Sequence, residues 1–204
     1  MPSPTFFKLA DAKRKHFMAE AYKEFSRNSF EAASITNLVK SLGIAKGSVY
    51  QYFEDKEELY EYLVLDANKQ LNLLLDKACA YNGEKFYDWY TKLLMVELKF
   101  LLSFPQFAVL FQKLLTESSN PLRSLAQEIE NNWLDRITVN LPVSLYDSAI
   151  NNKILVRSPL LIFEMITTNL NLNKLIEDED PVYLGSKELV SLCTEWVEKL
   201  EQGL

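Results

Sequence analysis

Apolar residues recur every three or four positions along most of the chain, which is the spacing of amphipathic helices. After Ser34 the apolar positions are Ile35, Leu38, Val39 and Leu42, and Gly43 follows them directly. Serine favours a helix start because its hydroxyl accepts a bond from a first-turn N–H, and glycine favours the left-handed turn just past a helix end. Ile44 is expected to turn back into the core, before a second helix of about two turns. The pattern predicts two short helices joined by a tight turn.

The same periodicity predicts helices over most of the remaining chain. They are expected from Lys8 or Ala12 to Arg27, from Asp55 to about Ala80, from Lys85 to Phe104, after Pro105, after Asn120-Pro121, from Leu160 to Leu175 and from Lys187 to Gln202. The helix at residue 55 opens with Asp55-x-x-Glu58, a capping pattern that places acidic groups at the positive end of the helix. No run with the two-residue period of a strand competes with these helices. The sequence therefore predicts an all-α fold.

Composition narrows the class of protein. A chain of 204 residues with 48% hydrophobic residues and five glycines favours a compact, helix-rich protein of one or two domains. Cys79 and Cys193 form neither a metal-binding spacing nor a disulfide framework, so we expect a cytoplasmic protein. The start has no signal-peptide core, and the most apolar stretch, from Phe100 to Phe111, is too short and too polar to span a bilayer. No membrane partner is expected.

The net charge of −6 is divided unevenly along the chain. Residues 1–53 carry eight basic and four acidic side chains, a net charge of +4, and the remaining residues carry 14 basic and 24 acidic side chains, a net charge of −10. This asymmetry is typical of a small head that binds nucleic acid on an acidic body.

The second of the two short helices has a polar outer face. Its outward side chains are all hydrogen-bond donors: Lys46, Ser48, Tyr50, Gln51 and Tyr52. Val49 and Phe53 lie four residues apart and share the buried face. Such a helix suits a DNA major groove, although the spacing alone fits any helix-turn-helix corner.

The residues are more specific than their spacing. The run Gly43-Ile44-x-Lys46-Gly47-Ser48-Val49-Tyr50-x-Tyr52-Phe53-x-x-Lys56-x-x-Leu59 resembles the DNA-binding signature of the TetR family of transcriptional regulators, and the likeness covers roughly residues 13–65. It implies a three-helix DNA-binding head in residues 1–54 and a larger helical ligand-binding and dimerisation body in residues 55–204. Asn28-Ser29 stands where the family usually has glycine before the aromatic position at Phe30. Asparagine tolerates a left-handed backbone, so we expect the turn to be kept.

The resemblance also implies roles for residues of the head. Phosphate contacts are expected from Ser34, Ser48, Tyr50, Tyr52 and Lys56. Base edges are expected to be read by Lys46, with Thr36 and Gln51 as weaker candidates, and Gly47 is small enough to approach the DNA backbone closely. The partner is expected to be a double-stranded DNA operator.

The body is dense in aromatic residues, which have two interpretations. They form either an ordinary core or an incompletely filled core with an apolar pocket and a few polar groups. In the resembling family the helices after the head enclose a small-molecule pocket. The candidate lining residues here are Trp89, Tyr90, Phe100, Phe104, Phe107, Phe111, Gln112 and Trp133.

The last two expected helices suit a homodimer interface. The helix from Leu160 to Leu175 is apolar almost all round, and the helix from Lys187 to Gln202 has a clear apolar stripe. The resemblance implies a two-fold four-helix interface, and the alternative is packing within one chain. A dimer would place two reading helices about 34–36 Å apart and require a near-palindromic operator.

Enzyme chemistry has no support in the sequence. His16 is the single histidine, no nucleotide-binding, zinc-protease or nucleophile motif occurs, and no Glu-x-x-His motif accompanies carboxylates such as Glu97, Glu128 and Glu164. No catalytic residue, metal or cofactor is expected. The resulting interpretation is a ligand-responsive transcriptional regulator, a repressor released from its operator by a small apolar or aromatic effector. The alternatives are a helical protein-interaction module and a ligand-independent activator.

Overall fold

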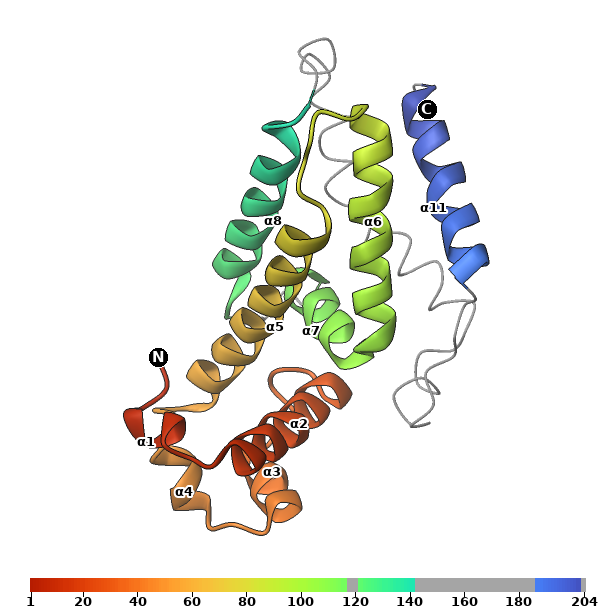
Figure 1. The fold of residues 1–204 in the computed structure, drawn as a ribbon. Helices are drawn as coiled ribbons and strands as arrows, with labels where there is room; N and C mark the ends of the chain where they lie inside the picture. Colours follow the sequence, from red (N-terminus) through yellow and green to blue (C-terminus); the bar gives the residue numbers. More distant parts are fainter. Residues whose placement is uncertain (117–120, 142–185, 203–204) are drawn as a thin grey trace. The chain divides into compact units, whose positions relative to one another are not determined.

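The computed structural model describes residues 1–116, 121–141 and 186–202, and every structural statement below refers to these ranges (Figure 1). The helices are α1 (Pro4–Phe7), α2 (Asp11–Arg27), α3 (Ile35–Leu42), α4 (Lys46–Tyr50), α5 (Lys56–Ala78), α6 (Phe86–Ser103), α7 (Pro105–Thr116), α8 (Arg123–Thr138) and α11 (Ser186–Glu201). These ranges contain no strand, and the all-α prediction is confirmed. The expected helix from Leu160 to Leu175 lies outside the described residues.

The chain divides into two compact units. The head unit contains residues 1–69 and 109–126, and the body unit contains residues 70–108 and the chain from residue 127 onward. Helices α5 and α7 each begin in one unit and end in the other. The first half of α5 and most of α7 belong to the head unit with the N-terminal helices. The expected boundary between residues 54 and 55 stays a prediction.

A cluster of aromatic rings forms the core of the head unit. Phe6, Phe17 and Phe53 are almost fully buried, with ring centroids 5.0 Å apart for Phe6 and Phe53 and 5.8 Å apart for the stacked pair of Phe17 and Phe53. Phe6 belongs to α1, a short helix that the sequence did not lead us to expect. The residues before α1 are hydrogen-bonded to the segment just after α4, because the Ser3 amide donates to the Tyr52 carbonyl at 2.8 Å. The N-terminal residues thus complete the support under α4.

Both ends of α3 have the predicted capping residues. The Ser34 hydroxyl accepts from the Thr36 amide at 3.2 Å, and Gly43 ends α3 with φ +64°. Glycine adopts this left-handed conformation without a Cβ clash. Two details differ from expectation: Ile44 is 36% exposed rather than in the core, and α4 is only five residues long. Helix α2 packs against α3, and α3 packs against α4.

The loop from α2 to α3 does not use the expected left-handed asparagine. Asn28 follows α2 in an extended conformation, with φ −117° and ψ 152°. The chain therefore leaves α2 without the glycine-type turn that would fold it back over the last carbonyls of the helix.

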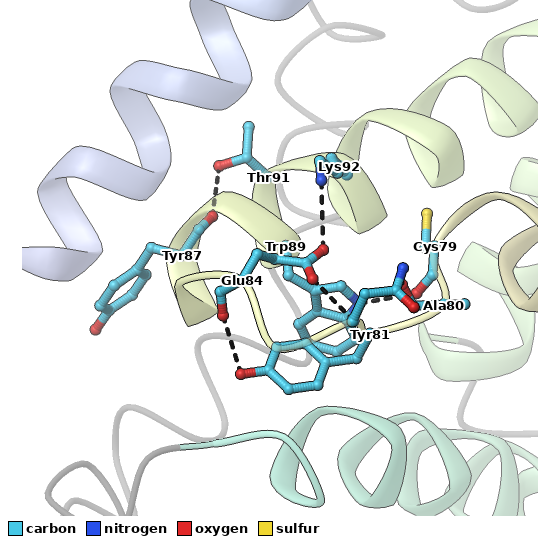
Figure 2. A network of polar contacts seen from close by, with 9 residues as sticks. Cys79, Ala80, Tyr81, Glu84, Tyr87, Trp89, Thr91 and Lys92 are labelled. Carbon is cyan, nitrogen blue, oxygen red and sulfur yellow. Dashed lines mark hydrogen bonds and ion pairs between the residues drawn. The ribbon is translucent and has the colours of Figure 1, made fainter.

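Two packed helices and an anchored connection characterise the body unit. Helix α11 packs against α6 (Figure 1). Figure 2 shows the connection between α5 and α6, where the buried indole N–H of Trp89 donates to the Cys79 carbonyl at 2.8 Å. The Tyr81 ring lies edge-on to Trp89, with centroids 5.6 Å apart, and its hydroxyl donates to the Glu84 carbonyl. Trp89 therefore fixes the path of the chain after α5.

No single helix within the described ranges is long and apolar enough to cross a bilayer. The successive helices α6 and α7 reach the necessary length and apolarity only together, as a bent pair.

Candidate nucleic-acid interface and body site

Helix α4 and the two residues after it form a largely exposed polar surface, which we name the α4 face: Lys46, Gly47, Ser48, Tyr50, Gln51 and Tyr52. Lys46, Gly47 and Gln51 are exposed, and Tyr50 is 48% exposed. Val49 points the other way and is 1% exposed, as the four-residue spacing to Phe53 predicts. The one-turn helix therefore shows its cation and most of its donors to solvent.

Ser48 and Tyr52 are half-buried rather than fully outward. The Tyr52 ring packs against Phe6 and Phe17, with centroids 5.9 and 5.8 Å away. Its position is therefore fixed by the aromatic core of the head unit. At Gly47 an added Cβ would meet no atom within 4 Å, so packing inside the protein does not require glycine there.

The start of α3 supplies two further candidates. Thr36 is exposed, whereas Ser34 is half-buried and has the capping role described above. The Ser34 amide also receives a bond from the Glu24 carboxylate of α2, at 2.8 Å. These contacts set the position of α3 against α2.

The half-buried ammonium of Lys56 is bonded to the backbone of the protein itself. Its Nζ donates to the carbonyls of Phe30, Glu31 and Ala33 at 2.7, 3.1 and 3.2 Å, and it lies 4.6 Å from the centre of the Phe30 ring. In this structure the first turn of α5 thus holds the loop from α2 to α3. The predicted phosphate contact of Lys56 would need one or more of these bonds to be exchanged.

A second lysine, which the sequence did not single out, binds the backbone where α2 ends and this loop begins. Lys113 of α7 donates to the carbonyls of Phe25, Ser26 and Asn28 at 3.2, 2.8 and 2.5 Å. More than 80 residues separate the lysine from these partners. The one signal in the sequence was the lack of glycine after α2, which leaves carbonyls to be satisfied from elsewhere.

The candidate ligand residues fall into separate groups. Trp89 and Tyr90 are buried with Phe86, whose ring stacks on Tyr90. Phe100, Phe104 and Phe107 form a second cluster with centroids 5.3–5.5 Å apart, and Phe104 is 46% exposed. Trp133 is buried on α8. The last two candidates, Phe111 and Gln112, belong to the head unit.

A hollow of the body unit lies elsewhere. It is an open, polar groove lined by Asn72, Asn132, Asp135, Arg136, Val139 and Asn140, and it contains none of the candidate aromatic residues. Arg136 crosses it to α5, where its guanidinium lies 2.7 Å from Asp76 and 3.1 Å from the side-chain oxygen of Asn72.

Glu97 is a buried acid in the middle of α6. It is 6% exposed, and its Oε2 has no hydrogen-bond partner. Burial raises the pKa of this carboxyl well above its usual range, and the nearby Arg136 charge lowers it only in part. Among the other carboxylates considered, Glu128 is exposed and Glu164 lies outside the described residues.

The described residues contain no group of three histidine, cysteine or acidic side chains placed to hold a metal ion. Both cysteines are buried, and burial raises the pKa of the Cys193 thiol to about 12, so it is a thiol and not a thiolate at neutral pH.

The head unit contains a helix-turn-helix, made by α3 and α4, with the exposed α4 face. Residues 17–63 match the family described as bacterial regulatory proteins, tetR family. The match covers less than a quarter of the chain and includes helices α3 and α4 and the start of α5.

Individual relatives resemble the chain over different lengths. The uncharacterized HTH-type transcriptional regulator YdgC of Bacillus subtilis is 31% identical over 70 residues, which are 34% of this chain and 36% of that protein. A TetR family regulator from Chloroflexus aurantiacus matches 100% of this chain and 98% of its own with a TM-score of 0.79 and 24% identity. Bacillus subtilis FadR, solved in complex with stearoyl-CoA, has a TM-score of 0.67 and 17% identity over 93% of this chain and 98% of its own.

Proposed function

We propose that the protein binds a DNA operator through the α4 face and represses transcription there. The observation that carries this proposal is the exposure of Lys46, Tyr50 and Gln51 on a helix fixed from below by Val49 and Phe53. Lys46 reads base edges, with Thr36 and Gln51 in support, and Ser34, Ser48, Tyr50 and Tyr52 contact phosphates. Gly47 allows the close approach of the DNA backbone. Packing within the protein does not explain a glycine there, because an added Cβ would meet no atom within 4 Å.

The operator is proposed to be near-palindromic and bound by a homodimer. The apolar stripe of α11 and the expected helix at residues 160–175 form the interface in this proposal. Val190, on α11, is 39% exposed and is available for such a contact. In this proposal residues 1–54 bind DNA, and residues 55–204, which begin with α5, bind the ligand and form the dimer.

The effector is proposed to be a small apolar or aromatic molecule bound in the body. The support comes from the density of buried aromatic residues there and from similar folds among regulators of fatty acid metabolism and degradation, including FadR with stearoyl-CoA. Binding changes the position of α5 and so the spacing of the two heads. Glu97 Oε2, which has no hydrogen-bond partner among the described residues, offers this interior a polar atom.

Replacing Lys46 by alanine is expected to weaken binding to the preferred duplex by about 1–3 kcal/mol and to relax sequence preference. The duplex is first obtained by selection of bound DNA from a random pool, and affinities for it and for single-base variants are then measured at fixed salt. Lys69→Met, on an exposed position of α5, is the control and should change neither quantity. Unchanged affinity and preference in Lys46→Ala would exclude it as a base reader, and failure to select any duplex would refute DNA recognition.

Stearoyl-CoA at saturating concentration is expected to weaken binding to the selected duplex roughly 5–150-fold, the range of a coupling free energy of about 1–3 kcal/mol. The measurement is a fluorescence-anisotropy titration with and without the ligand. Coenzyme A without the acyl chain is the control and should have no effect. Binding of stearoyl-CoA with equal operator affinity in both states would contradict release by this ligand.

A further inference from the structure

The last carbonyls of α2 have an unusual partner. A helix ends with carbonyls that lack an intrahelical N–H, and a left-handed glycine commonly brings the following amides back to them. Asn28 is extended instead, so the chain moves away from the helix end. The ammonium of Lys113 occupies this place and donates to the carbonyls of Phe25, Ser26 and Asn28.

The loop that follows is held by the second ammonium. Lys56 donates to the carbonyls of Phe30, Glu31 and Ala33. Together the two lysines contact six carbonyls between residues 25 and 33, and we name this arrangement the lysine clamp. The loop ends one residue later at Ser34, the cap of α3.

We propose that Lys113 is a positioning residue for DNA recognition, because it keeps the loop between α2 and α3 in the one shape that presents α3 and the α4 face together. A lysine suits this task since one ammonium has three donors, and a cation is favoured at the negative end of a helix. Lys113 is half-buried on α7 and belongs to the head unit.

The lysine clamp affects DNA affinity by setting the fraction of molecules whose loop between α2 and α3 has the shape that binds DNA. If removing the ammonium leaves about a tenth of the molecules competent, the apparent Kd rises about tenfold. Lys113 itself contacts no phosphate in this proposal. The dependence of affinity on salt concentration, which counts phosphates neutralised, therefore stays unchanged.

The test compares Lys113→Met, which keeps an apolar stem of similar length, with the wild type and with Lys113→Arg, which keeps the positive charge. Lys113→Met is expected to bind the selected duplex roughly 5–30-fold more weakly, a loss shared by all sequences, with an unchanged salt slope. Amide hydrogen exchange should quicken in residues 25–38 and remain unchanged in α6. Lys113→Arg should recover part of the affinity. Lys69→Met serves as the matched lysine control.

Two results would overturn the inference. One is wild-type affinity together with wild-type exchange in Lys113→Met. The other is a salt slope lower by about one, which would make Lys113 a phosphate contact. The inference rests on the proposed DNA binding, but the two fail separately: no selectable duplex counts against the proposed function, whereas unaltered exchange in residues 25–38 of Lys113→Met counts against the clamp alone.

Discussion

Replacing Phe53 by alanine is expected to destabilise the protein by about 3–5 kcal/mol, the cost of removing a buried aromatic side chain. Phe53 is 1% exposed, and its ring meets those of Phe6, Phe17 and Tyr62 at 5.0, 5.8 and 5.7 Å. The cavity left by alanine would lie under α4 and remove the packing that fixes α1. Binding to the selected duplex should be lost in the same variant. Urea unfolding followed by circular dichroism measures the first effect, and anisotropy titration the second.

Tyr50→Ala is the matched control for this experiment. Tyr50 is the last residue of α4 and lies three residues before Phe53, yet it is 48% exposed. Its removal should change stability by less than about 0.5 kcal/mol, as for other surface positions, and still reduce DNA affinity. A Phe53→Ala protein with near wild-type stability would show that the aromatic cluster is not the support of α4.

Replacing Glu97 by glutamine is expected to stabilise the protein increasingly as the pH rises. Burial raises the pKa of the Glu97 carboxyl in the folded state, so in the wild type the folded protein holds a proton that the unfolded chain has already released. The free energy of unfolding of the wild type therefore decreases with pH above the unfolded pKa of about 4.3, by up to about 1.4 kcal/mol for each pH unit until the folded pKa is passed. A glutamine side chain does not ionise, so it adds no such pH dependence to the free energy of unfolding. Urea titrations at several values between pH 5 and pH 8 measure the difference.

Glu128→Gln, on an exposed position of α8, is the control for Glu97. It should follow the wild-type stability profile across the whole range. If the stability difference between Glu97→Gln and the wild type stayed constant with pH, the carboxyl would not be an abnormally protonated acid. A difference that decreased with pH would mean that the Arg136 charge outweighs burial.

Helical periodicity was sufficient to predict the class of fold and most helix positions. The cap at Ser34, the left-handed Gly43 and the helix starts near residues 55, 85 and 105 follow from local chemistry, which a sequence displays directly. Helix α1 escaped prediction because Pro4 and the short segment after it show no full helical period, and its stability comes from Phe6 packing in the core. Ile44 was misplaced because apolarity does not distinguish a core position from an exposed one at a turn.

The candidate interface was predictable for the same local reason. Val49 and Phe53 identify the inner side of α4, and the remaining positions must point outward. The bonds of Lys56 and Lys113 were not predictable, since they join residues 23 to 88 positions apart and depend on the tertiary fold. The burial of Glu97 without a partner for Oε2 was likewise hidden, because the sequence shows a carboxylate in an apolar helix but not whether a partner reaches it.

The distant origin of Lys113 has a consequence for the growing polypeptide. At a bacterial or eukaryotic translation rate of about 5–20 residues per second, roughly 3–12 seconds pass between the addition of Phe53 and that of Lys113. During this interval the nascent head has every residue of its recognition helices but lacks the side chain that closes the end of α2. A ribosome-bound chain is therefore expected to gain its final loop shape only after α7 has left the exit tunnel.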